Sequence, residues 1–321
     1  MHTFTIGTND AGQRADKFLR KACPQLPTSL LYKTFRKKDV KCDGKRIPPE
    51  TILHEGAVLQ IYLPEDCFTE KAEPAAPPKS AARLPKPDII YEDAQIAVLR
   101  KPIGIPVHAD DHGTEDTLIA RFLRHLIDTG AYRPEEEQSF TPALCNRLDR
   151  NTEGFVLAAK TAAALRCMNE KIRNGEIHKQ YYCVTVGAPP KNSDVVTAYH
   201  KKISDNQVIL SELPKIGFRE IRTGYQVLAQ KNDLSLLQVT LYTGRAHQIR
   251  VQMAALGCPI LGDPRYGRMD ANIRHGQRYQ LLSACKLRFV FSEEPCCLSA
   301  LNGMEFSFVP QFAGPFLEAE H

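Results

Sequence analysis

A proline- and alanine-rich segment at residues 65–88 divides this chain of 321 residues into two unequal parts. The segment contains few large apolar residues and five prolines, Pro74, Pro77, Pro78, Pro85 and Pro87. Such a composition cannot build a packed core and favours an extended, semi-rigid linker. The sequence therefore predicts a small domain at residues 1–64 and a larger one at residues 89–321, which move relative to each other.

The composition of the whole chain is that of a globular protein. Hydrophobic residues make up 43% and charged residues 25% of it. No apolar run approaches the length of about 18 residues that a membrane-spanning helix needs. The first residues lack the basic start and apolar core of a secretory signal. We therefore expect a cytoplasmic protein without a membrane partner.

The ten cysteines are scattered, and no two of them form a Cys-x-x-Cys pair. The adjacent Cys296 and Cys297 have a spacing that suits neither a disulfide nor a zinc site. We interpret the cysteines as reduced thiols and expect no metal site, unless distant residues converge.

Positive charge is concentrated in the first part of the chain. Residues 1–65 carry eleven Lys and Arg against seven Asp and Glu, and thus +4 of the net charge of +5. The cluster consists of Lys33, Arg36, Lys37, Lys38, Lys41, Lys45 and Arg46. A charge run is usually a solvated helix face. Here it leads into a predicted hairpin, so helix and hairpin would present one positive surface to a phosphate backbone, with Lys37 and Lys38 as candidate contacts.

Periodicity predicts the elements of both parts. In the first part, residues 12–19 and 29–38 have helical spacing, Asp43 and Gly44 form a hairpin turn, and residues 57–63 read as a strand. In the larger part, helices are predicted at about 116–128, 162–174 and 245–256. Strands are predicted at 89–91, 96–99, 179–186, 195–200, 207–210, 219–229 and 234–242. Strands in meander order with helices set aside indicate an α+β fold.

Asp149 is the most promising single residue for chemistry. Arg147 and Arg150 flank it in sequence, and a Thr-Glu-Gly turn follows. A neighbouring cation favours the charged form of a carboxylate, so Asp149 would serve as a base or nucleophile at neutral pH. Taken alone, the segment also describes an ordinary turn or helix cap.

Two further segments accompany it. Residues 101–108 read Lys-Pro-Ile-Gly-Ile-Pro-Val-His, and residues 243–267 hold a dense set of polar residues and glycines around a short helix. In content, order and spacing, these segments and residues 145–157 resemble the RluA family of RNA pseudouridine synthases. Residues 1–64 resemble a small RNA-binding module of a ribosomal small-subunit protein, which often precedes such catalytic domains.

The resemblance implies a mixed, largely antiparallel sheet with flanking helices and a cleft across it. It also implies isomerisation of uridine in RNA, most often large-subunit ribosomal RNA, to pseudouridine. Asp149 would be the nucleophile, whether it attacks the sugar, attacks the base or assists elimination. Arg250 would be its ion-pair partner, and Tyr181 the aromatic residue beside the flipped base. This chemistry needs no cofactor, and we expect a monomer.

Four other residues are candidate substrate contacts. Arg147, Arg245 and His247 would position RNA or support the cleft, and Leu282 matches an apolar residue beneath the flipped base. Strand alternation places Tyr181 on the face opposite Val184. As an alternative, Tyr181 and Leu282 are ordinary core residues.

Several positions depart from the family pattern. Other residues are common at Asn146, Glu153, Ala246, Gln252 and Ser283. These departures bear on which uridine is modified. A non-catalytic RNA-binding ribosome-assembly factor would explain the basic first part equally well, but not a carboxylate with a matching arginine. A hydrolase acting on a nucleoside or sugar would need a second carboxylate to activate water, and none stands out near these motifs.

Overall fold

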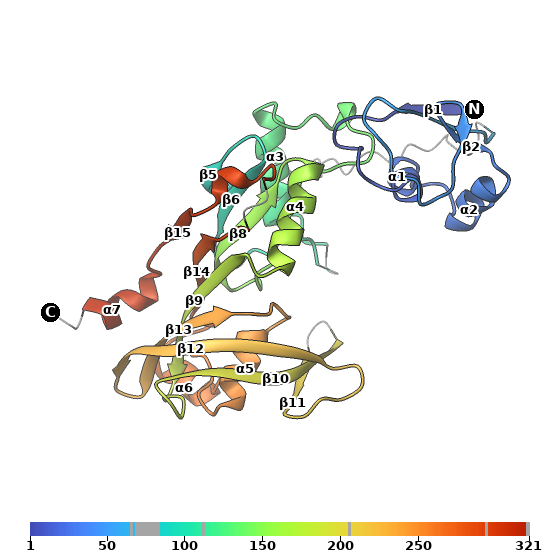
Figure 1. The fold of residues 1–321 in the computed structure, drawn as a ribbon. Coiled ribbons are helices and arrows are strands. Elements are labelled where there is room, and N and C mark those ends of the chain that lie inside the picture. The colour runs from blue at the N-terminus through green and yellow to red at the C-terminus, as the bar shows by residue number, and fades with distance from the viewer. Residues whose placement is uncertain (65–66, 68–83, 111–112, 205–206, 293–294, 319–321) are drawn as a thin grey trace.

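The computed structural model describes residues 1–64, 67, 84–110, 113–204, 207–292 and 295–318. They form two parts, each with its own sheet (Figure 1). We call residues 1–64 the N-terminal part and residues 84–318 the C-terminal part. Most of the predicted linker lies outside the described residues. Within the described ranges, no helix is both long and apolar enough to cross a bilayer.

The N-terminal part packs two helices against an antiparallel sheet in the order β1-β4-β2-β3. Its elements are β1 His2–Thr5, α1 Ala15–Ala22, α2 Thr28–Arg36, β2 Val40–Cys42, β3 Lys45–Arg46 and β4 Val58–Ile61. Phe18, Leu31 and Leu59 are fully buried in its core. The predicted helix start at residue 12 is wrong. Gly12 has a φ of +76° and pairs through its N–H with Leu53, so the helix begins only at Ala15.

The C-terminal part contains a sheet of eleven strands with helices on its faces (Figure 1). Its strands are β5 Asp88–Glu92, β6 Ile96–Lys101, β7 Ala143–Leu144, β8 Glu153–Ala159, β9 Ile177–Val186, β10 Ser193–Ser204, β11 Gln207–Ser211, β12 Arg219–Lys231, β13 Leu234–Leu241, β14 Leu282–Phe289 and β15 Glu305–Ser307. Its helices are α3 Leu118–Asp128, α4 Ala162–Arg173, α5 Gln248–Ala255, α6 Met269–Arg274 and α7 Gly314–Leu317, with 3-10 turns at Pro134–Glu136, Ser299–Leu301 and Gln311–Ala313.

The strand order is β11-β10-β12-β13-β9-β14-β8-β6-β5, with β7 on β8 and β15 on β14. All pairs are antiparallel except β14 with β8. This confirms the predicted α+β class with a mixed, largely antiparallel sheet. The strands predicted between residues 179 and 242 correspond to β9 through β13, but the predicted meander order is wrong, because β9 pairs with β13 and β12 pairs with β10. The sequence did not predict β8 and β14, which join these strands to β5 and β6.

Both faces of the central sheet are buried, and side chains alternate between them. In β8, Val156 and Ala158 pack with Phe122 of α3, whereas Phe155 and Leu157 pack with Met168 of α4. The same alternation divides β9. Tyr181 and Cys183 face α5, and Val184 and Val186 lie in a different cluster, as the period of two requires.

Helix ends follow local chemistry. Thr117 and Thr161 cap α3 and α4 by accepting hydrogen bonds from Ala120 and Ala164. The predicted helix at 245–256 is shorter, because His247 has a left-handed φ of +54° and α5 begins at Gln248. Gly257, with a φ of +81°, follows its C-terminal end as the sequence predicted.

Gly154 allows the one parallel pairing of the sheet. Its φ is +126°, and a Cβ at this position would lie 2.3 Å from the carbonyl oxygen of Ala284 in β14. Only a residue without a side chain lets β8 and β14 approach so closely.

The two parts are in contact. Polar side chains of residues 9–13 bond to residues 137–139 and to the first turn of α4. The linker composition predicted parts that move relative to each other, but the structure places them against each other.

We expect Gly154→Ala to lower the free energy of unfolding by about 3 kcal/mol or more, because the added methyl group forces β8 away from β14. Gly130→Ala is the control, since Gly130 has a φ of +70° but no heavy atom within 4 Å of an added Cβ. It should cost about 1–2 kcal/mol. Urea denaturation measures both. Equal losses would show that backbone strain alone requires glycine at residue 154.

Candidate active site

Asp149 lies in the loop between β7 and β8, where its carbonyl oxygen accepts a hydrogen bond from the N–H of Thr152. Its side chain is 28% exposed. One carboxylate oxygen, Oδ2, lies 2.7 Å from Nη1 of Arg250. A carboxylate that is partly exposed and partly paired can reach a substrate and stay oriented at the same time.

Arg250 projects from α5 and is buried between two carboxylates. Its Nε and Nη2 donate to Oδ2 and Oδ1 of Asp263 at 2.7 and 2.8 Å. Burial opposes the charge of Arg250, but its hydrogen bonds to Asp263 and the negative charges of Asp263 and Asp149 raise its pKa. The guanidinium therefore stays charged and is held in one plane by two bonds to Asp263.

Asp263 has no exposed side-chain surface. It also accepts hydrogen bonds from the backbone N–H groups of Arg265 and Tyr266. Burial opposes its ionisation, but the hydrogen bonds from Arg250 leave the pKa of Asp263 below its ordinary value. Asp263 thus fixes Arg250, and Arg250 in turn orients Asp149.

His247 stands beside this ion pair at the N-terminal end of α5. Its Nε2 lies 3.9 Å from Oδ2 of Asp149, and its Nδ1 lies 2.9 Å from the hydroxyl of Tyr266. Burial is the main cause that lowers the pKa of His247. The ring of Tyr266 also faces the guanidinium of Arg250, with 5.3 Å between the guanidinium carbon and the ring centroid.

An apolar cluster borders Asp149. Tyr181 of β9 and Leu282 of β14 are buried in it with Leu148 and Ile249. Burial, and then the charge of Asp149, raise the pKa of Tyr181, so its phenol stays neutral. The site therefore places one partly exposed carboxylate beside a buried, largely apolar cluster that includes one tyrosine.

Lys101 anchors the backbone of the loop that carries Asp149. Its ammonium group donates to the carbonyl oxygens of Pro102, Ile105 and Arg150 at 2.8, 2.9 and 2.8 Å. The side chain is fully buried at the end of β6. Because Arg150 follows Asp149 directly, this contact fixes the backbone beside the carboxylate.

The structure brings together four of the predicted site residues, Asp149, Tyr181, Arg250 and Leu282, with His247 beside them. Arg147 and Arg245 are exposed on neighbouring segments. Arg147 lies near His108, whose pKa is lowered by burial and then by Arg147. Lys37 and Lys38 lie at the end of α2 in the N-terminal part, away from α5 (Figure 1).

The cation that contacts Asp149 is not one of its neighbours in the sequence. The flanking Arg150 pairs with Asp110, and the cation that contacts Asp149 is Arg250, 101 residues along the chain. Two adjacent side chains on an irregular loop point in different directions, so proximity in sequence did not imply contact.

Sequence reasoning missed Asp263, Tyr266 and the role of Lys101. A signal was present for each. Asp263 and Tyr266 belong to the dense segment at 243–267, and Lys101 ends an apolar strand, where a charged residue requires buried partners. Their partners are distant in the chain, and the sequence did not reveal them.

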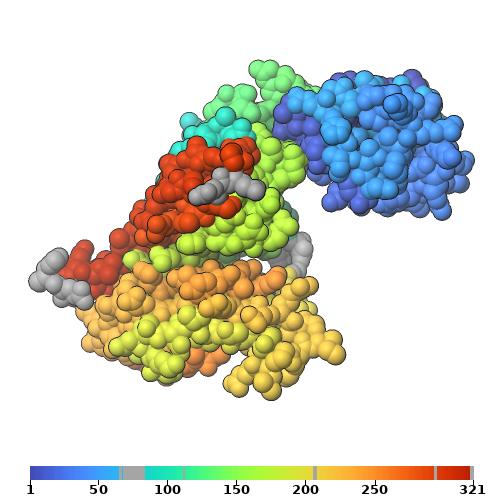
Figure 2. Space-filling model, in the orientation of Figure 1, coloured from blue at the N-terminus to red at the C-terminus, as the bar shows by residue number. Residues whose placement is uncertain are grey.

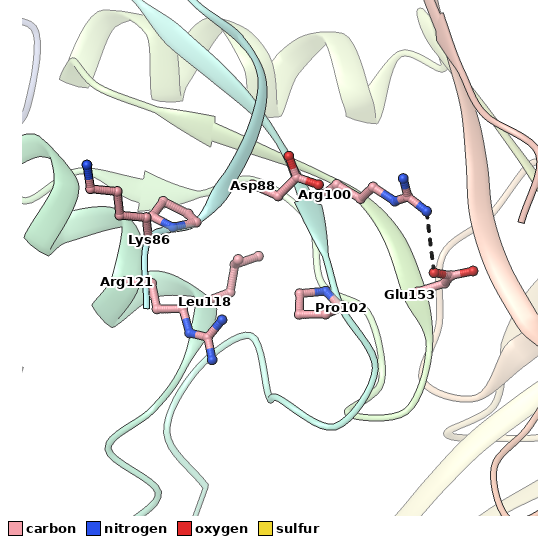
Figure 3. Close-up of a pocket in the computed structure, with 8 residues that line it drawn as sticks. Lys86, Asp88, Arg100, Pro102, Leu118, Arg121 and Glu153 are labelled. Atoms are coloured by element: carbon pink, nitrogen blue, oxygen red, sulfur yellow. Dashed lines mark ion pairs between the residues drawn. The ribbon is translucent and has the colours of Figure 1, made fainter. Parts of the chain in front are cut away.

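A small cavity of about 350 Å³ lies elsewhere, between β5, β6 and α3 (Figure 3). Lys86, Arg100, Arg121, Asp88 and Glu153 are among its lining residues. Two of its cations are paired, Arg100 with Glu153 and Arg121 with Asp116. None of the four central site residues lines this cavity. In the described ranges, no three His, Cys, Asp or Glu side chains are grouped to hold a metal.

Comparison with known proteins agrees with this geometry. Residues 95–255 match the family described as RNA pseudouridylate synthase. The chain belongs to this family. It is 32% identical over 313 residues to ribosomal large subunit pseudouridine synthase C of Vibrio vulnificus, which covers 95% of this chain and 94% of that protein. It is 34% identical over 264 residues to the Salmonella typhi protein of the same name, covering 82% and 78%.

A solved structure gives the same fold. The human RNA pseudouridylate synthase domain containing 4 superposes with a TM-score of 0.54 at 22% identity, covering 73% of this chain and 91% of that chain. The resemblance to the RluA family is thus confirmed. The protein is an RNA pseudouridine synthase, an isomerase that converts uridine in RNA to pseudouridine. Family membership favours the enzyme over a non-catalytic RNA-binding factor.

Two of the departures from the family pattern have structural roles here. Asn146 accepts a hydrogen bond from the N–H of Leu157 through its side-chain oxygen. Gln252 accepts one from the hydroxyl of Thr223 at 2.5 Å and donates to the carbonyl of Val196. Gln252 therefore fastens α5, and with it Arg250, to the sheet.

We expect Asp263→Asn to lower kcat at least tenfold and the free energy of unfolding by about 3–5 kcal/mol, because it leaves the buried Arg250 without one of its carboxylates. Asp270→Asn serves as a control, since Asp270 is 61% exposed. Isomerisation rates and urea denaturation measure the two effects. Loss of stability without loss of kcat would mean that Asp263 supports the fold alone.

Lys101 gives a pH-dependent prediction. Burial lowers the pKa of Lys101 from 10.5 to about 7. Between these values the unfolded chain binds a proton that the folded protein does not, so this group makes stability rise with pH, by about 1.4 kcal/mol per pH unit. Lys101→Met should therefore flatten the dependence of the unfolding free energy between pH 7 and 9, relative to the parent and to a control, Lys231→Met. Equal slopes would show that three carbonyl oxygens keep the amine protonated.

Proposed function

We propose that this enzyme isomerises uridines of large-subunit ribosomal RNA, with Asp149 as the nucleophile. The observation that carries the role of Asp149 is its position, partly exposed at the edge of an apolar cluster and oriented by Arg250. The relatives are named for the ribosomal large subunit, which supports the choice of RNA. A ribosomal substrate in turn supports a cytoplasmic location, and we propose that the enzyme acts as a monomer.

The reaction breaks the bond between N1 of uracil and C1′ of ribose and forms a bond between C5 and C1′. N1 gains a proton and C5 loses one, so the change is redox-neutral. Asp149 can attack the sugar, attack the base or assist elimination, and each route needs a carboxylate held in place. Arg250 supplies the orientation, and Asp263 keeps Arg250 from turning to other partners.

The target base must leave its stack to reach Asp149. We propose that Tyr181 and Leu282 contact the flipped uracil, because both lie in the apolar cluster beside the carboxylate. Exclusion of water there strengthens the electrostatic interactions of Asp149 with the substrate. Arg147, Arg245 and His247 would bind the flanking nucleotides. Arg147 and Arg245 are exposed, and His247 borders the ion pair.

The N-terminal part, residues 1–64, is proposed to be an RNA-binding domain, followed by a linker at 65–88 and a catalytic domain at 89–321. Its exposed cations support this role. Lys37 and Lys38 end α2, where both side chains are open to solvent and to a phosphate backbone.

Asp149→Asn should reduce isomerisation by about a thousandfold or more, because the amide keeps the size of the side chain but cannot act as an anionic nucleophile. RNA affinity should stay within a few-fold. Release of tritium from RNA that carries uridine labelled at C5 measures the rate, and Asp128→Asn on the surface of α3 is the control. Substantial turnover by Asp149→Asn would exclude the assignment.

For the N-terminal part, we expect a variant with Lys37→Gln and Lys38→Asn to bind ribosomal RNA with a weaker salt dependence. Each lost phosphate contact should reduce the log–log slope by roughly 0.7–0.9. Asn suits position 38, where φ is +65°. A control with Arg173→Gln and Lys231→Gln has the same net charge. If both variants keep the slope of the parent, Lys37 and Lys38 do not contact phosphate.

A further inference from the structure

The two parts of the chain are joined by a polar interface. Six hydrogen bonds of 2.5–3.1 Å connect them among the described residues. Gln138 donates to the carbonyl of Thr5 and to Asp10, and Ser139 donates to Asp10 and accepts from Gln13. These contacts join a turn after β1 to the segment between the Pro134–Glu136 turn and β7.

Asn9 extends this interface to helix α4. Its side-chain nitrogen donates to Glu137 at 2.6 Å, and its side-chain oxygen accepts from the N–H of Ala162 at 3.0 Å. Ala162 is the first residue of α4, so a residue of one part satisfies a free helix N–H of the other. Gly12, without a side chain, leaves room for Arg166 of the same helix.

Burial at the interface shows that these contacts are specific. The carboxylate of Asp10 accepts from both Gln138 and Ser139, and the residue is only 2% exposed. Burial of a carboxylate is unfavourable unless hydrogen bonds satisfy it. The placement of the N-terminal part that forms these bonds is therefore favoured over placements that do not. The six hydrogen bonds between the two parts are polar contacts, as expected for two parts that fold separately and then dock.

The docked placement has a consequence for charge. Figure 2 shows a hollow between the N-terminal part and the lobe that carries β10 and β11. Each of the two bodies that flank the hollow carries exposed cations. They are Lys33, Arg36, Lys37, Lys38, Lys45 and Arg46 in the N-terminal part, and Lys201, Lys202, Lys215 and Arg219 on and after β10 and β11.

We propose that Asn9, Asp10, Gln138 and Ser139 are positioning residues that fix the N-terminal part as one wall of an RNA-binding hollow, so that the enzyme selects uridines in RNA whose structured flank contacts both walls. This inference rests on the proposed function, because it takes RNA as the substrate. The interface residues act through the placement of the basic surface and do not touch the reacting base.

The expected effect is on substrate capture. A docked N-terminal part presents its cations at a fixed distance from Asp149. It has therefore already lost its freedom of motion before RNA binds. A part held only by its linker offers the same cations at a lower effective concentration. Disruption of the interface should therefore raise KM for large structured RNA and leave kcat and the use of short RNA unchanged.

The test uses the full chain with Gln138→Ala and Ser139→Ala, which together remove four of the six hydrogen bonds from the side of the C-terminal part. The matched control is Glu135→Ala with Glu136→Ala, in the preceding turn, where Glu136 pairs with Arg133. Substrates are large-subunit ribosomal RNA and a short hairpin built around a uridine that the parent enzyme is first shown to modify in that RNA. For the interface variant, kcat/KM on ribosomal RNA should fall about tenfold or more through KM, and the hairpin should change less than twofold.

A second variant, Asn9→Ala, removes the remaining two hydrogen bonds from the N-terminal side and should shift the same ratio. Small-angle scattering should show a larger radius of gyration for a variant that combines Asn9→Ala, Gln138→Ala and Ser139→Ala than for the control. An unchanged ratio of kcat/KM between the two RNAs would overturn the inference, whether both values stay the same or fall by the same factor. A parent enzyme that isomerises neither RNA would overturn the proposed function, and this inference with it.

Discussion

The contacts of Arg250 with two carboxylates organise the active site. A buried guanidinium is costly unless its donors are used, and Asp263 takes two of them in a planar, bidentate contact. This leaves Nη1 of Arg250 for Asp149, at a fixed place and angle. The three groups together carry one surplus negative charge. Asp263 has no exposed side-chain surface and Asp149 is partly exposed, so the surplus negative charge is accessible at Asp149.

The sheet brings these groups and the apolar wall together. The close pairing of β8 with β14 at Gly154 places the Asp149 loop beside β14, and β14 lies next to β9. Leu282 is opposite Cys183 in that pairing, and both share a buried cluster with Tyr181. A substrate base that enters this region exchanges water for an apolar surface and a single anion. That environment suits a reaction in which a carboxylate must act without competition from water.

The roles that we propose in substrate capture and in chemistry fall in different parts of the molecule. The N-terminal part contributes most of the excess positive charge, and its core is independent of the C-terminal part. Its polar interface with residues 137–139 and α4 has hydrogen bonds that water can replace at modest cost. Such an interface is specific in geometry and limited in strength. It can therefore set where RNA is held without contributing to the stability of the catalytic core.

The sequence by itself determined the local features of this protein. Apolar periodicity identified α3, α4 and the strands β9 to β13, since each pattern depends on neighbours a few residues apart. The motifs indicated the family, and the family resemblance indicated Asp149, Tyr181, Arg250 and Leu282 as candidate site residues. Only the tertiary structure decided that Asp263 holds Arg250 in place against Asp149, and that Lys101 fixes the loop through three carbonyl oxygens. It also decided that the parts dock through Asp10 and Asn9. The physical reason is that most of these contacts join residues distant in the chain, from 13 positions for Arg250 with Asp263 to 153 for Asn9 with Ala162. Their energies depend on burial and direction, which local spacing does not contain.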